Sequence, residues 1–309
     1  MMMRYFYLRQ YPSVFVKMTG LRVAEFDKWV EEVQPRLREA EEARLDRPER
    51  QRGLGGGRKA QLELRDQLLL TVIWLRLYLV QDLLAYFFGS SQSAVSNYID
   101  HVLPVLEQAG RDTMRMPDPG RKRRRKLDQL LADLPEVLVV IDSFEQKVQR
   151  PRDPTEQQEF YSGKKKTHTL KSQIAVDEQT GEIVDVSDSV PGPTADITLL
   201  DQSALLDDLP DEIGGMGDSG YQGIAQRHSH GYSPRKKPKG KPRPPEDTAY
   251  NHAFSRTRII VENTIGRMRR YQAITQPDRQ HRQQHTARVI AVAGLANRQI
   301  RCRHLFAAV

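Results

Sequence analysis

Hydrophobic and polar positions follow two different patterns along the chain, and the change comes near residue 126. Before that point apolar residues recur every three or four positions, which is the spacing of helices that bury one face. Pro35 is expected to break the first helix because proline lacks the N–H that a helix interior needs. A Gly- and Arg-rich stretch at 47–60 is expected to be a linker. Helices are predicted over residues 23–45 and 62–79, and two shorter helices within residues 80–106.

After residue 126 the pattern favours strands. Five apolar, mostly β-branched residues at 137–141 run directly into Asp142, which predicts a strand buried on both faces and ending in a carboxylate. The predicted fold class is therefore α+β or α/β, with an all-α N-terminal region followed by a mixed sheet. The other predicted elements are a hairpin at 167–189 with its turn at 177–181, a helix at 195–208, a short strand and sharp turn at 213–223, a basic Pro-rich loop at 233–247, and helices at 250–270 and 285–301.

The chain is basic, with 48 Lys and Arg against 40 Asp and Glu, a net charge of +8 and a pI near 9.5. Such a pI is the usual footprint of nucleic-acid binding, although a solvated basic surface gives the same value. A cationic run at 121–126 is expected to be exposed. The single cysteine, Cys302, excludes an internal disulfide framework and a Cys-based zinc site. No stretch approaches the ~20 apolar residues of a membrane helix, so we expect a cytoplasmic protein.

Residues 80–106 fit a helix-turn-helix. A short amphipathic helix at 82–88 is followed by Gly89 and by a second helix at about 92–103, and glycine suits the tight connection between them. The same pattern also fits an ordinary αα-hairpin. The shared core is predicted from Leu83, Leu84, Phe87, Val95 and Ile99. The second helix offers short polar side chains suited to base edges and phosphates, namely Gln92, Ser93, Ser96, Asn97 and His101.

Three acids are candidates for chemistry. Asp142 ends the first predicted strand, Asp218 lies in the Gly-bracketed turn "GMGDSGYQG", and Glu262 lies on a later helix. Such acids can converge on one patch of a mixed sheet and bind Mg²⁺, a hard cation that prefers oxygen ligands. Arg258 and Arg269 fall within about 40° of Glu262 on the helical face, where they suit DNA phosphate. Alternatively, the two aspartates fit turn or cap positions, and Glu262 fits an i,i+4 pair with Arg258.

Together these motifs resemble those of the DDE-type transposases of insertion sequences, in particular the IS5 group and its DDE superfamily endonuclease relatives. "VIDSFEQ" is similar to their first-Asp strand and "GDSGYQG" to their second-Asp turn. Arg258-x3-Glu262-x6-Arg269 matches most of their Tyr-x2-Arg-x3-Glu-x6-Lys/Arg signature, with Ser255 in the place of the tyrosine. "YSGKKKTHTLKSQIAVD" and "VPGPTADITLL" resemble their central strands, and residues 80–106 resemble their N-terminal DNA-binding segment. The resemblance covers about residues 58–301.

This resemblance implies an RNase H-like catalytic domain in which Asp142, Asp218 and Glu262 hold Mg²⁺ or Mn²⁺, with two ions expected. It also implies that the protein binds double-stranded DNA at transposon ends, cleaves it, and joins the freed 3′-OH to target DNA. Two ends must be brought together, so a homodimer or larger assembly, associated with the nucleoid, is expected. The expected domains are a helical segment and linker at 1–60, a helix-turn-helix and basic linker at 61–126, and the catalytic domain at 127–309.

Further candidates are weaker. Asp196 precedes an apolar run and fits a helix cap better than a fourth acid of the site. Two other functions stay open, a non-catalytic DNA-binding regulator and a domesticated metal-dependent endonuclease, both derived from a transposase. Lysines that either contact DNA or merely solvate loops are Lys164, Lys165, Lys166, Lys236 and Lys237.

Overall fold

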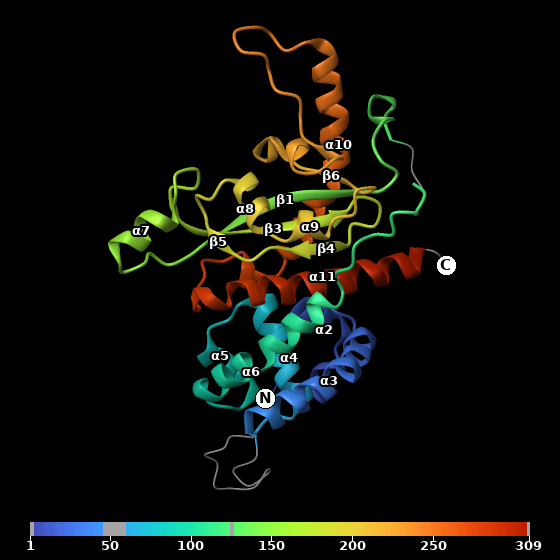
Figure 1. The fold of residues 1–309 in the computed structure, drawn as a ribbon. Helices are drawn as coiled ribbons and strands as arrows, with labels where there is room; N and C mark the ends of the chain where they lie inside the picture. Colours follow the sequence, from blue (N-terminus) through green and yellow to red (C-terminus); the bar gives the residue numbers. More distant parts are fainter. Residues whose placement is uncertain (1–2, 46–59, 124–126, 308–309) are drawn as a thin grey trace.

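The computed structural model of the chain describes residues 3–45, 60–123 and 127–307, so most of the predicted linker at 47–60 lies outside it. A helical N-terminal bundle is followed by a mixed sheet with helices on both faces (Figure 1). The α+β architecture expected from the sequence is thereby confirmed, whereas the proposed boundaries after residues 60 and 126 stay predictions. In the described parts of the chain no helix has the length and apolar character needed to cross a membrane.

The N-terminal bundle contains two helices that the sequence pattern did not predict, α1 and α2. α3 runs through Pro35 without interruption, so the predicted break is wrong. Proline there forfeits one backbone hydrogen bond, but the buried side chains of Val33 and Leu37 hold the helix against the bundle on both sides of it. The bundle helices are α1 (Tyr5–Leu8), α2 (Pro12–Thr19), α3 (Val23–Leu45), α4 (Leu64–Leu77), α5 (Gln81–Phe88) and α6 (Gln92–Arg111).

The predicted helix-turn-helix corresponds to α5 and α6. Gly89 joins them in the left-handed conformation with a φ of 60°, which glycine adopts without strain. Ser91 begins α6 by accepting the N–H of Ala94 at 3.2 Å, a favourable N-cap. Of the predicted core residues, Leu84, Val95 and Ile99 are buried.

Leu83 was wrongly predicted to belong to this core, because its side chain is 39% exposed. The inward positions of α5 are Leu84, Ala85 and Phe88. These positions fit one face of a helix that starts at Gln81, and Leu83 falls outside that face.

The sheet is built around β1, with the order β2-β3-β1-β6-β7, and β4 and β5 also pair with β3. β3 is antiparallel to both β1 and β4, whereas β6 and β7 run parallel to β1 and to each other. A mixed sheet of this order with helices on both faces agrees with the expected RNase H-like domain. The strands are β1 (Leu138–Lys147), β2 (Tyr161–Ser162), β3 (Thr167–Asp177), β4 (Ile183–Val186), β5 (Val190–Pro191), β6 (Gly214–Met216) and β7 (Gly231–Tyr232).

Two layers of helices cover the sheet. Alternate residues of β1 face opposite sides: Val140 packs with α10 and α11, and Ile141 packs with α8 and α9. The helix predicted at 195–208 is in fact split at Ser203 into α8 and α9. The helices of this part are α7 (Pro154–Phe160), α8 (Asp196–Gln202), α9 (Leu205–Asp208), α10 (Pro245–Met268) and α11 (His285–Ala307), with short 3-10 turns at Gln129–Leu131, Ser219–Tyr221, Ile224–Gln226, Gln272–Ile274 and Arg282–Gln284.

α11 lies between the sheet and the N-terminal bundle and joins them (Figure 1). It crosses α6 where two glycines meet, and a Cβ at Gly294 would lie only 2.5 Å from the Cα of Gly110. Nearby, the hydroxyl of Tyr78 at the end of α4 donates to Asp278 at 2.9 Å. Asp278 also pairs with the fully buried Arg288 of α11. The bundle and the sheet therefore share one continuous core.

Candidate active site

Asp142 lies inside β1 and not at its end. β1 continues to Lys147 because β3 pairs with it along this whole length, so the prediction that the strand ends at Asp142 is wrong. Its other neighbour, β6, pairs only with residues 138–140. Beyond Val140 no described strand pairs with that side of β1, and Asp142 lies on this open stretch.

Asp218 lies at the equivalent level, two residues beyond the end of the neighbouring strand β6. Val140 is opposite Met216 in the parallel pair, and each aspartate comes two residues later. The two acids therefore lie at the same level, Asp142 within β1 and Asp218 just beyond β6. Asp218 also accepts the N–H of Gly220 at 2.7 Å and caps the 3-10 turn that follows. The cap interpretation of Asp218 is thus correct, and it does not prevent a second role for the other carboxylate oxygen.

Glu262 is exposed on α10, which packs against the same face of β1 that carries Asp142. The pKa of Asp142 is raised to about 6, chiefly by burial, with smaller contributions from the negative charges of Asp218 and Glu262. The guanidinium of Arg258 and the N–H of Ser143 oppose this rise without cancelling it. The three predicted acids therefore lie close enough to interact electrostatically.

Arg258 contacts an acid rather than facing solvent. Its Nη2 lies 3.3 Å from Oδ2 of Asp142, and its side chain is 11% exposed. The alternative pair with Glu262 is thus not the one that the structure forms. Arg269 follows the last residue of α10 and is exposed. Ser255, at the position of the family tyrosine, donates its hydroxyl back to the carbonyl of Asn251 at 2.8 Å.

The acids are not arranged as a finished metal centre. Within the described residues, no group of three or more His, Cys, Asp or Glu side chains is placed so that it could hold a metal ion. The ion pair with Arg258 engages Asp142, and Glu262 points to solvent. The chemistry of the donors nevertheless fits a hard divalent cation, because all three supply carboxylate oxygens. The assignment of these residues as metal ligands stays a prediction.

Asp196 is a residue of this region that the sequence interpretation misjudged. It is the first residue of α8 but makes no capping hydrogen bond. Its Oδ1 instead accepts the hydroxyl of Ser143 at 2.8 Å and the ammonium of Lys171 at 2.9 Å. The cap prediction was therefore wrong, and Asp196 lies beside the strand that carries Asp142. Nothing in the local sequence indicates these partners, because they belong to β1 and β3.

The predicted DNA contacts on α6 separate into two groups. His101 faces α3, where its Nε2 lies 2.9 Å from Oε2 of Glu41, and burial lowers the pKa of its imidazole. The prediction that His101 faces outward is wrong because α3 covers this part of α6. Ser96 is half-buried. The exposed residues lie near the N-terminus of α6 and are Gln92, Ser93 and Asn97.

The predicted basic contacts are exposed on two turns. Lys164, Lys165 and Lys166 form the turn between β2 and β3, and Lys236 and Lys237 lie between β7 and α10. This second loop and the first half of α10 stand out from the sheet (Figure 1).

Arg235 attaches the projecting loop to α10. Its guanidinium lies 4.1 Å from the ring centroid of Tyr250 and 3.0 Å from Asp247. These contacts hold the loop segment that carries Lys236 and Lys237 against α10.

The cationic run at 121–126 is only partly exposed. Arg121 pairs with Asp177 at 2.7 Å, and Arg123 pairs with Glu178 at 2.6 Å. The expectation of an exposed run is wrong for these two arginines, because their partners lie where β3 turns into β4. Residues 124–126 lie outside the described residues.

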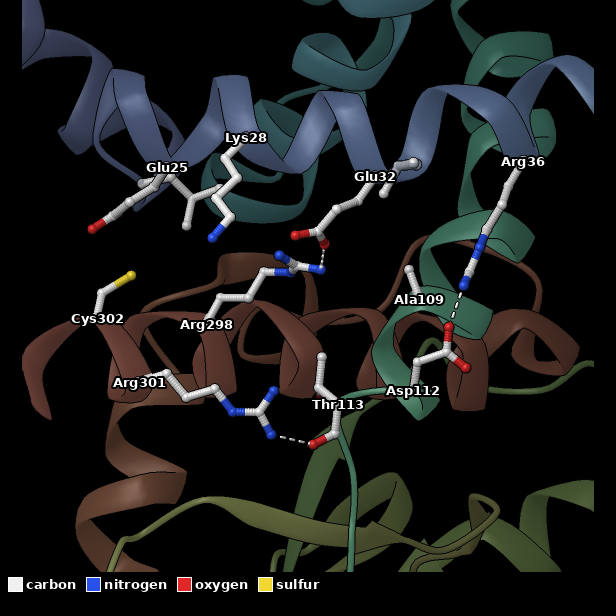
Figure 2. A pocket seen from close by; sticks show the side chains of 12 residues that line it. Glu25, Lys28, Glu32, Arg36, Ala109, Asp112, Thr113, Arg298, Arg301 and Cys302 are labelled. Atoms are coloured by element: carbon white, nitrogen blue, oxygen red, sulfur yellow. Dashed lines mark hydrogen bonds and ion pairs between the residues drawn. The ribbon is translucent and has the colours of Figure 1, made fainter. Parts of the chain in front are cut away.

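A cavity of about 620 Å³ lies between α3, the end of α6 and α11 (Figure 2). Ion pairs cross it from Arg298 to Glu32 and from Arg36 to Asp112. None of the predicted catalytic or DNA-binding residues lines it. The cavity therefore belongs to the junction of the bundle with α11.

Comparison with known proteins finds matches to both parts of the chain. The family model described as DDE superfamily endonuclease matches residues 141–297, and the model described as helix-turn-helix of DDE superfamily endonuclease matches residues 60–112. A curated protein named "Probable transposase for insertion sequence element IS702", from Microchaete diplosiphon, is 28% identical over 286 residues, which is 93% of this chain and 94% of that protein. No solved structure matches.

The first match begins one residue before Asp142 and includes Asp218 and Glu262, and the second covers α4, α5 and α6. The narrower IS5 assignment is compatible with these findings and stays a prediction. Since the endonuclease match spans half of the chain, the protein belongs to the DDE superfamily endonuclease family and carries that family's helix-turn-helix.

Proposed function

We propose that the protein is a transposase that binds the terminal repeats of an insertion sequence, cleaves the DNA there and transfers the freed strand to target DNA. Membership of an endonuclease family supports nuclease chemistry. The likeness to a protein named as a probable insertion-sequence transposase, over nearly the full length of both chains, supports the more specific function.

One observation carries the catalytic part of this proposal. Asp142 and Asp218 follow the last paired residues of two adjacent parallel strands by the same number of positions, and the charge of Glu262 acts on Asp142 from α10. Strands hold carboxylates more rigidly than loops do, which suits a site that must bind a cation in a fixed geometry.

In this proposal Asp142, Asp218 and Glu262 hold Mg²⁺ or Mn²⁺, with two ions expected. Bound there, the cations would activate water and stabilise the charge on the attacking and leaving oxygens of a displacement at phosphorus. Arg258, which pairs with Asp142 at 3.3 Å, would exchange this carboxylate for a DNA phosphate when a cation binds. A guanidinium is suited to either partner.

The DNA is proposed to contact α6 through Gln92, Ser93 and Asn97, with Ser96 at the edge of this surface. Arg269 and the exposed lysines of the two basic turns would contact the backbone, which makes binding depend on salt. At least two copies are needed to hold two ends together, and the proposal includes the expected association with the nucleoid.

The catalytic assignment can be tested with a supercoiled plasmid, Mg²⁺ or Mn²⁺, and the variants Asp142→Asn, Asp218→Asn and Glu262→Gln. Each is expected to reduce cleavage at least about a hundredfold, because several kcal/mol of charge stabilisation are lost. Glu159→Gln, which changes an exposed acid of α7, is the matched control and should cleave normally. If all three variants fold and cleave like the wild type, the assignment of the acids is wrong. Specific DNA binding without any cleavage would instead favour a regulator.

A further inference from the structure

Asp196 connects the two segments that carry Asp142 and Asp218. Its Oδ1 accepts the hydroxyl of Ser143, the residue next to Asp142, at 2.8 Å. The same oxygen pairs at 2.9 Å with Lys171, whose ammonium also donates to the carbonyl of Thr194. Both side chains are largely buried, with 10% of Lys171 and 23% of Asp196 exposed. The charge of the Asp196 carboxylate is therefore balanced by Lys171, and the carboxylate is held in one orientation.

The other oxygen of Asp196 faces the turn that carries Asp218. A Cβ added at Gly220 would lie 2.3 Å from Oδ2 of Asp196 and 3.0 Å from Oδ1 of Asp218. The two carboxylate oxygens can be no farther apart than the sum of these distances. Any side chain at this position would push the acids away from each other, so only glycine allows the turn to approach α8 this closely.

Tyr221 anchors the same turn to the core of the sheet. Its ring is fully buried in the core on the α8 side of the sheet. Its hydroxyl lies beside that of Ser143 but makes no hydrogen bond of acceptable geometry with any described residue. Burial raises the pKa of this hydroxyl, and the charges of Asp196, Asp142 and Asp218 raise it further. The turn is thus fixed by packing at Tyr221 and by close contact at Gly220.

We propose that Asp196 is a positioning residue that sets the spacing between Asp142 and Asp218 by holding Ser143 with one carboxylate oxygen and contacting Gly220 with the other. This inference rests on the proposed role of Asp142 and Asp218 as cation ligands. Asp196 does not itself bind the cation, because Lys171 neutralises it. What the site requires from residue 196 is the shape of the side chain and an acceptor oxygen.

The test measures the Mn²⁺ dissociation constant of the full chain by calorimetry, together with its melting temperature. Asp196→Ala and Gly220→Ala are each expected to weaken binding at least tenfold. Asp196→Asn keeps the acceptor oxygen and should stay within threefold of the wild type. Asp196→Ala and Gly220→Ala disturb the same contact. The double variant should therefore bind Mn²⁺ no more weakly than whichever single variant has the larger dissociation constant.

Two controls match these changes. Asp201→Ala alters another acid of α8, one whose partner is the surface residue Arg227. Gly163→Ala adds a Cβ with nothing within 4 Å. Both should bind Mn²⁺ like the wild type. If Asp196→Ala does not fold, Ser143→Ala takes its place in the test. This variant removes one hydrogen bond of Asp196 without adding bulk, and we expect it to bind Mn²⁺ about threefold more weakly than the wild type.

The outcomes separate this inference from the proposed function. If Asp142→Asn and Asp218→Asn lose Mn²⁺ binding while Asp196→Ala, Gly220→Ala and Ser143→Ala keep it, the positioning role is refuted and the catalytic acids stand. A loss in Asp196→Asn as large as that in Asp196→Ala would also refute it, because charge and not position would then matter. If the wild type does not bind Mn²⁺, or Asp142→Asn and Asp218→Asn bind it equally well, the proposed function itself fails.

Discussion

At the scale of single residues, His285 shows how the core depends on protonation. The imidazole is fully buried at the start of α11. Its Nε2 lies 2.8 Å from Oε1 of Gln146, and its Nδ1 lies 2.6 Å from the hydroxyl of Ser189. Because the amide nitrogen of Gln146 donates to two backbone carbonyls, its Oε1 accepts from Nε2. In the neutral ring Nδ1 then accepts from the hydroxyl of Ser189. Burial lowers the pKa of His285 to about 3, with a further contribution from the positive charge of Arg288.

His285 should therefore make the protein less stable in acid. Between the ordinary pKa of 6.5 and the folded value of about 3, the unfolded chain takes up a proton that the folded chain does not. As the pH is lowered through this window, the free energy of unfolding should decrease by up to about 1.4 kcal/mol per pH unit. Asp142, whose pKa rises from 3.8 to about 6, acts in the opposite direction between those values.

Urea unfolding at pH 6.5 and pH 5 in the wild type and in His285→Gln separates the two effects, since both proteins keep Asp142. The wild type should lose more stability than the variant over this interval. An equal loss in both proteins would mean that His285 does not control it.

Single residues also show which parts of the candidate site could be predicted from the sequence. Asp142, Asp218 and Glu262 could be identified because each lies in a short local motif that resembles the family. Asp196 could not, because its partners Ser143 and Lys171 are distant in the sequence. Its position before an apolar run is equally typical of an ordinary helix cap.

At the scale of elements, the helix-turn-helix offers two kinds of surface on one helix. Gln92 and Asn97 of α6 are exposed, whereas His101 lies against α3. Substituting Gln92 and Asn97 by alanine should weaken binding to the element's end by about 1–3 kcal/mol for each base that the variant can no longer hydrogen-bond. His101→Ala should leave the preference for end over random DNA unchanged.

Competition binding with end and random DNA checks this prediction directly. A preference that survives the Gln92 and Asn97 substitutions would exclude the exposed face of α6 as the reading surface. A preference that disappears in His101→Ala alone would contradict the placement of His101 outside the surface that reads the DNA.

Elements were predictable where the local pattern dominates. Gly89 and the apolar spacing around it located α5 and α6, and the run at 137–141 located β1. The end of β1 was not predictable, because β3 extends the strand by pairing with it as far as Lys147. The short helices α1 and α2 were also missed, since four and eight residues are too few for a clear period.

At the scale of the whole molecule, a buried ion pair lies where the bundle meets the sheet. Arg288 of α11 is fully buried beside Asp278, which also accepts the hydroxyl of Tyr78 from α4. Arg288→Met should destabilise the protein by roughly 3–5 kcal/mol, because it leaves the buried carboxylate without its partner.

The matched control is Arg227→Met, which breaks an exposed ion pair with Asp201 and should change stability little. Chemical denaturation followed by helix content measures both variants. Equal stabilities would show that the buried pair does not stabilise this junction. This joint could not be predicted from the sequence, because Tyr78 and Asp278 are 200 residues apart.

The most direct test of the transposase assignment maps breaks on a plasmid that carries the DNA flanking the gene. Purified wild-type protein and Asp218→Asn would be incubated with it in Mg²⁺ or Mn²⁺. We expect breaks at the ends of the element that disappear in the variant. Breaks scattered over the plasmid, or end breaks that persist in Asp218→Asn, would contradict the assignment.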